Sequence, residues 1–172
     1  MRTLLDTLYR ASGAIAAVFM VGVLLMVLLG IATREFGIYL RGTDDYAGYS
    51  MAACGFLSLA YTFKHGEHIR VSLFIERLSG KARHSLEWLA LLIGTAAAAT
   101  LAWYSVRLVS NSLEFNEISQ GIDATALWIP QLGMAIGTVV LFIALADDLL
   151  LTSLGRPIRH LKDHSSEPAR VE

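Results

Sequence analysis

Cysteine and charged residues are both scarce in this sequence. Of its 172 residues, one is a cysteine, Cys54, and 17% are charged, whereas a soluble domain typically has about a quarter charged residues. A single cysteine excludes a disulfide bond within the chain. The net charge of −1 gives no bias toward nucleic acid. The composition therefore argues against a soluble protein and against a nucleic-acid partner.

The long apolar runs contain no histidine that could bind a haem and no proline break at their middle that could form a transport site. None of the five histidines lies in a long apolar run, which disfavours a haem held between transmembrane helices. His65 and His68 are three residues apart, but no Cys or carboxylate pattern completes a metal site around them. No apolar run has a Gly/Pro break at its middle, which disfavours a self-contained transporter. We therefore expect no enzyme activity, no cofactor, and no catalytic or metal-binding residue.

Long apolar runs dominate what is present. A bilayer core about 30 Å thick needs about 20 helical residues, and hydrophobic residues make up 55% of the chain. The second of four runs is the marginal one, because it is shorter and carries hydroxyl side chains. We expect an all-α integral membrane fold with one four-helix domain over residues 1–160 and a flexible cytoplasmic tail over residues 161–172. The four expected spans cover residues 11–32, 47–63, 86–106 and 127–146.

The positions of Lys and Arg predict the orientation. Eleven of the fourteen lie in the N-terminal tail, between the second and third runs, or after the fourth run. Because positive charge is retained on the cytoplasmic side, both termini are expected inside the cell. Tryptophan favours the two membrane–water boundaries, and we interpret three tryptophans as anchors. Trp88 falls at the expected inner boundary, and Trp103 and Trp128 at the outer one.

The segment between the second and third runs has an amphipathic pattern. Its apolar residues share one helical face, and basic residues occupy much of the rest. This pattern is typical of a helix lying in the headgroup plane against anionic lipid. The alternative is a solvated linker. The apolar face would consist of Val71, Phe74, Ile75, Leu78 and Ala82.

Small residues recur at helical spacing in the second and third runs. Small side chains let two helix backbones approach closely in a bilayer. Such positions can serve either a partner membrane protein or packing among the chain's own helices, and the sequence leaves both open. Our candidates for a partner interface are Gly55, Ser58, Gly94 and Ala98.

Two acidic residues, Asp147 and Asp148, directly follow the fourth run. They are expected near the cytoplasmic boundary rather than at mid-membrane, which argues against a proton relay. An unpaired charge at that depth is costly. We therefore predict a structural ion pair with Arg10 or Lys64, which should lie at the same depth.

Three short segments resemble one membrane-protein family. The sequence GFLSLAY at 55–61 is followed by KHGEHIRV at 64–71, and TALWIPQLG occupies 125–133. They are similar to the small membrane subunit of TRAP transporters, the DctQ family, in the end of its second helix, the loop after it and the start of its fourth helix. The chain departs from that pattern at Ser58, where glycine is usual, and at Ser72, where aspartate is usual.

The resemblance implies a role rather than a site. It implies a multi-pass protein of the bacterial inner membrane that acts as a scaffold for a large, DctM-type membrane subunit. In such systems the large subunit works as a sodium-driven elevator, and a periplasmic solute-binding protein delivers an organic acid to it. A membrane anchor subunit of a respiratory redox complex is the alternative from another functional class.

Overall fold

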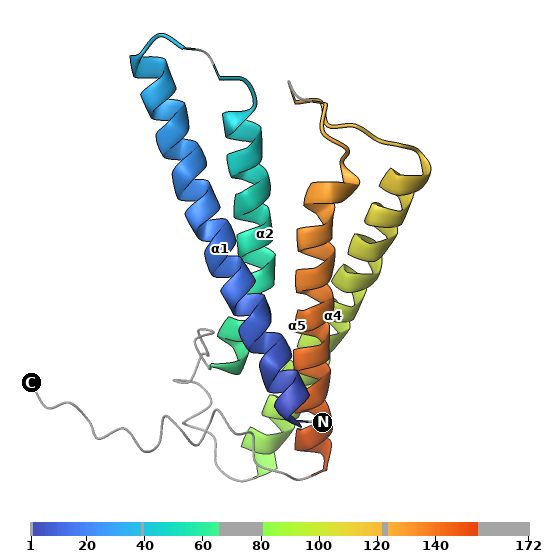
Figure 1. Ribbon diagram of the computed structural model, residues 1–172. Coiled ribbons are helices and arrows are strands. Elements are labelled where there is room, and N and C mark those ends of the chain that lie inside the picture. Colours follow the sequence, from blue (N-terminus) through green and yellow to red (C-terminus); the bar gives the residue numbers. More distant parts are fainter. Residues whose placement is uncertain (1, 39, 66–80, 122–123, 155–172) are drawn as a thin grey trace, which may run out of the picture.

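The computed structural model describes residues 2–38, 40–65, 81–121 and 124–154. These residues form helices, turns and an isolated bridge between Ile118 and Ala126. The helices are α1 (Arg2–Glu35), α2 (Thr43–Lys64), α4 (Lys81–Glu114) and α5 (Trp128–Ser153), and Figure 1 shows them.

Local sequence accounts for the ends of the two shorter helices. α2 begins after Gly42, whose φ of 82° is a left-handed conformation that suits glycine. Asp44 and Asp45 in its first turn complement the positive end of the helix dipole. The helix ends at Lys64, and the backbone N–H of the next residue, His65, donates to the carbonyl of Tyr61. In α5, Pro130 lies in the first turn, where its missing N–H leaves no helical bond unmade.

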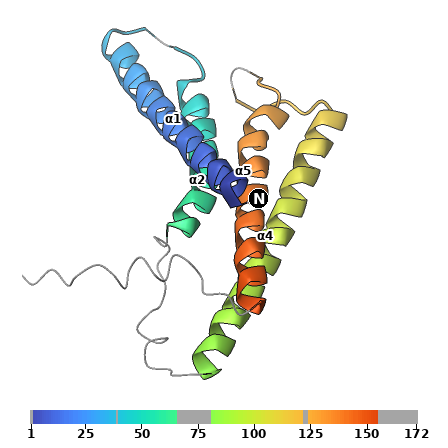
Figure 2. The same cartoon turned by 60° about the horizontal axis from the view of Figure 1, so that its bottom comes forward.

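The helices form two antiparallel hairpins, α1 with α2 and α4 with α5. The hairpins contact each other mainly through α2 and α5, so the four helices follow the order α1, α2, α5, α4 (Figure 1). Figure 2 shows the same pairing from another direction, with α1 crossing in front of α2 and with α4 beside α5. We call the side where α2 ends the Lys64 end and the side where α2 begins the Asp45 end.

Three of the described helices are long and apolar enough to cross a membrane. They cover Leu4–Glu35, Ser85–Glu114 and Trp128–Ser153. α2, which contains the expected span 47–63, is not among them, because charged residues occupy its ends and small or hydroxyl residues much of its middle. α1 and α4 extend past the apolar runs of the sequence, and 34 residues make each of them about 51 Å long.

Two sequence-based expectations fall outside the described residues. The in-plane helix over residues 71–82 falls almost entirely on residues 66–80, and the flexible tail over 161–172 falls within residues 155–172.

Candidate functional site

A charge cluster joins α2 to α5 at the Lys64 end. The Nζ atom of Lys64 lies 2.6 Å from Oδ1 of Asp148 and 3.0 Å from Oδ2 of Asp147. The Asp148 side chain is 3% exposed and the Asp147 side chain 33% exposed. Charge-assisted hydrogen bonds are the strong class of hydrogen bond, and here one ammonium group serves two carboxylates. Arg10, the other expected cation, is exposed.

Tyr9 brings α1 into the same cluster. Its side chain is 3% exposed and packs with Ala60 of α2 and with Val140 and Ala144 of α5. The Nζ atom of Lys64 lies 5.3 Å from the centroid of the Tyr9 ring, within the range of a cation–π interaction. Three helices therefore meet at one lysine side chain.

Glycines allow α5 to approach α2 closely. A Cβ atom built on Gly133 would lie 2.7 Å from Cβ of Ala53, and one built on Gly137 would lie closer than 3.0 Å to the backbone of Phe56. Real Cβ atoms essentially never make contacts this short. These two glycines were not among our candidates. Both lie within the fourth apolar run, and a search of that run for small residues, which favour helix contacts, could have found them.

The four small candidate residues separate into two groups. A Cβ on Gly94 would meet Leu145 of α5 at 3.7 Å, and Ala98 is buried within the chain, so both lie on the side of α4 that packs on α5. The positions of these two residues fit packing within the chain, which was one of the two alternatives that the sequence left open. Nothing lies within 4 Å of a Cβ built on Gly55, and Ser58 is partly exposed and donates to the Gly55 carbonyl.

An open strip of small residues therefore runs along α2. Gly48, Ala52 and Gly55 are all exposed, and their spacing of four and then three residues places them on one face. We call these three residues the α2 strip. The exposed side of α1 is different, with large aliphatic side chains along its length, among them Val18, Leu24, Leu25, Leu28 and Ile31.

The three tryptophans lie at the surface or partly at the surface. Trp88 and Trp103 of α4 are exposed, and Trp128 at the start of α5 is partly buried. Trp88 is nearer the Lys64 end and the other two are nearer the Asp45 end, since α4 and α5 run in opposite directions.

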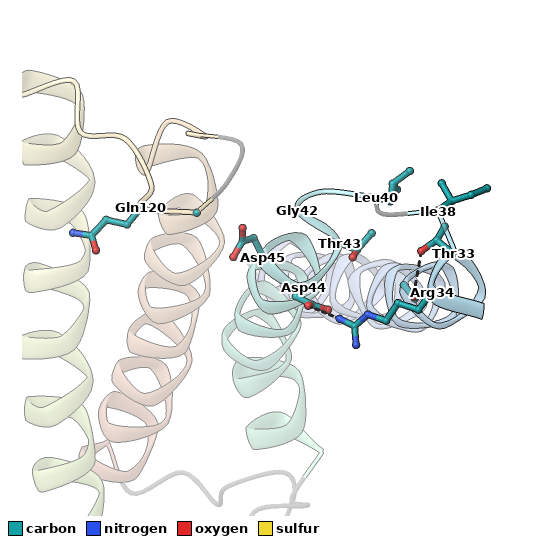
Figure 3. Close-up of a pocket in the computed structure, with 11 residues that line it drawn as sticks. Thr33, Arg34, Ile38, Leu40, Gly42, Thr43, Asp44, Asp45 and Gln120 are labelled. Atoms are coloured by element: carbon teal, nitrogen blue, oxygen red, sulfur yellow. Dashed lines mark hydrogen bonds and ion pairs between the residues drawn. The ribbon is translucent and has the colours of Figure 1, made fainter. Parts of the chain in front are cut away.

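The Asp45 end has a shallow hollow of about 200 Å³ between α1, α2 and residues 120–121 (Figure 3). Arg34 and Asp44 lie at its edge and bond each other at 2.9 Å, with side chains 68% and 82% exposed. A pair so exposed contributes little and does not present converging charges to a ligand. In the described part of the chain, no group of three or more His, Cys, Asp or Glu side chains could hold a metal ion.

Comparison with known proteins decides the family. The family model described as "Tripartite ATP-independent periplasmic transporters, DctQ component" matches residues 23–154, from the middle of α1 to the end of α5. The chain belongs to the DctQ family. A search of curated proteins returns no match for this sequence.

Membership in the DctQ family makes this chain the small membrane component of a TRAP transporter. The redox-anchor alternative has no support from the comparison. The family is a transporter component rather than an enzyme, and it works with a large DctM subunit and a binding protein.

Proposed function

We propose that this DctQ protein is a fixed scaffold for the large subunit of a TRAP transporter, in the sodium-driven uptake of an organic acid delivered by a periplasmic binding protein. The observation that carries this proposal is the family match, taken together with the arrangement of the helices. Polar contacts such as the Lys64 cluster and the hydrogen bond from Ser12 to Leu57 join one helix to another. A chain built in this way suits support better than transport.

We further propose that all four helices cross the inner membrane, with both termini in the cytoplasm and the Lys64 end on the cytoplasmic side. The distribution of Lys and Arg supports this orientation. α2 would then cross with α1 and α5 packed against it, although it is not among the three helices that are long and apolar enough to cross by themselves. The tryptophans would serve as boundary anchors, Trp88 inside and Trp103 and Trp128 outside.

The α2 strip is our proposed contact with the large subunit. Lipid chains are accommodated well by large aliphatic side chains, which cover α1, whereas small residues favour close approach of another helix. Gly55 and Ser58 lie on or beside this strip, and both remain interface candidates.

The experiment compares Gly55→Leu with Ala17→Leu during co-purification with the large subunit. Gly55 has open space around it and Ala17 is exposed on α1, so neither change should disturb the chain's own packing. We expect Gly55→Leu to reduce recovery of the large subunit and Ala17→Leu to leave it unchanged. Equal recovery with both variants would contradict the proposed interface.

Liposomes with a sodium gradient test the role itself. We expect uptake only when this chain, the large subunit and the binding protein are all present. Uptake by this chain alone would refute the scaffold function, and full-rate uptake without it would show that it is dispensable.

A further inference from the structure

The contacts between the two hairpins change in kind from one end of the α2–α5 pair to the other. At the Lys64 end they are ion pairs, and in the middle they are the close backbone contacts at Gly133 and Gly137. At the Asp45 end they are hydroxyl contacts, together with a contact of the Asp45 carboxylate with Gly121, between α2 and the residues that follow α4. The two hairpins should therefore separate more easily at one end of the α2–α5 pair than at the other.

Separation at the Lys64 end would be costly. The Asp148 side chain is buried. If Lys64 moved away, the carboxylates of Asp147 and Asp148 would lose the cation that they share. Removing one partner of a buried ion pair is strongly destabilising, since a buried charge loses its counter-charge. Tyr9 is packed under Lys64, so α1 would have to move as well.

Separation at the Asp45 end would cost much less. The hydroxyl of Tyr49 lies 2.5 Å from Oγ of Ser119, and that of Tyr46 lies 3.4 Å from Oγ1 of Thr125. Both bonds are neutral; the first is short and partly buried, and the second is long and exposed. Water can take the place of a neutral partner once the two ends separate. The carboxylate of Asp45 also packs against the open side of Gly121, a contact between the hairpins that is not an ion pair. Two further polar contacts there stay within one hairpin: Arg34 with Asp44 in the first and Ser112 with Glu117 in the second.

We propose that the chain has a permanent joint at Lys64 and a releasable latch, formed by Tyr46 and Tyr49 with Thr125 and Ser119, at the Asp45 end. The hairpins open and close at the latch while the Lys64 joint holds. This inference concerns the chain by itself in a membrane and does not depend on the transporter function proposed above, in which a fixed scaffold would keep the latch closed.

Pulsed electron–electron double resonance on the full chain in lipid nanodiscs tests the proposal. Spin labels on cysteines at Leu4 and Leu150 report the Lys64 end, and labels at Arg41 and Phe115 report the Asp45 end, all four positions being exposed. Cys54 is replaced by serine. We expect a narrow distance distribution for the Leu4–Leu150 pair and a broader one for the Arg41–Phe115 pair.

Variants separate the joint from the latch. Tyr46→Phe with Tyr49→Phe should shift the Arg41–Phe115 distribution to longer distances and leave the Leu4–Leu150 distribution unchanged. Lys64→Met should broaden the Leu4–Leu150 distribution, whereas Lys64→Arg should preserve it. An unchanged distribution in either the tyrosine variant or Lys64→Met would overturn the proposal.

Two aspartate variants keep the test decisive if Lys64→Met is not recovered from membranes. Asp148→Asn removes the more buried and closer partner of Lys64, so it should broaden the Leu4–Leu150 distribution. Asp147→Asn leaves the 2.6 Å bond in place and should have little effect. Equal effects of the two variants would contradict a joint centred on Lys64 and Asp148.

Discussion

At Gly137, one missing side chain sets the distance between two helices. A Cβ at this position would collide with the backbone of Phe56 and Leu57, which cannot move aside as a flexible side chain could. We expect Gly137→Ala to destabilise the folded chain by about 1–3 kcal/mol, the usual cost of overpacking. The loss of stability is measured as a lower unfolding temperature in detergent, with size-exclusion chromatography used to monitor how much folded protein remains after heating.

Gly48 is the matched control for that substitution. It is also a helical glycine, but nothing lies within 4 Å of a Cβ built on it. Gly48→Ala should keep or slightly raise stability, since alanine favours a helix more than glycine does. If the two variants unfold at the same temperature, the close approach of α5 to α2 is not a source of stability.

The difference between these glycines shows what sequence alone could provide. Helical spacing identified Gly55 and Gly94 as surfaces for close contact, but spacing fixes only which residues share a face. It does not say which neighbour that face meets. The structure places Gly94 against α5, leaves Gly55 open, and puts Gly133 and Gly137 in close contact with α2. Tertiary arrangement decides such cases, and one sequence does not contain it.

Among the elements, α1 is joined to α2 by a polar contact as well as by packing. Ser12 is buried, and its Oγ donates to the carbonyl of Leu57 at 2.6 Å. A net hydrogen bond contributes about 1 kcal/mol. We expect Ser12→Ala to lower the stability of the α1–α2 hairpin by about that amount, measured as the unfolding temperature of the full chain.

Ser110→Ala provides the comparison for Ser12→Ala. Ser110 is exposed on α4 and donates to Val106 in its own helix, so its loss should leave the unfolding temperature unchanged. Equal losses for the two serines would mean that the bond between helices has no special weight.

Helix positions followed closely from the sequence, whereas helix lengths did not. Each described helix contains most or all of one expected apolar run, because hydrophobic runs of that length favour helices whose backbone bonds are satisfied internally. α1 and α4 continue through polar residues at both ends, which a search for apolar runs cannot detect. A search for apolar runs also could not predict that α2 pairs with α5. The only sign of that pairing in the sequence was the set of charges at Lys64, Asp147 and Asp148.

For the whole molecule, cysteine labelling distinguishes four spans from three. Single cysteines replace the exposed residues Asp6, Arg41 and Glu114 in a Cys54→Ser background. If α2 crosses the membrane, Arg41→Cys and Glu114→Cys should react with an impermeant thiol reagent from the periplasm, and Asp6→Cys only after the membrane is opened. If α2 does not cross, α4 runs in the opposite sense, and the cysteines at 41 and 114 label from opposite sides.

The sparse burial of α1 has a consequence for biosynthesis. Its apolar window has a mean hydropathy of 2.9, yet only 11% of that window is buried within the chain. α1 can therefore enter the bilayer by itself as it leaves the ribosome, with no neighbour to wait for. α2 follows it, but α5, the helix whose glycines contact α2, is synthesised some sixty residues later. We expect nascent α2 to remain beside the insertion machinery until α5 emerges, so that the order of synthesis and the order of assembly differ.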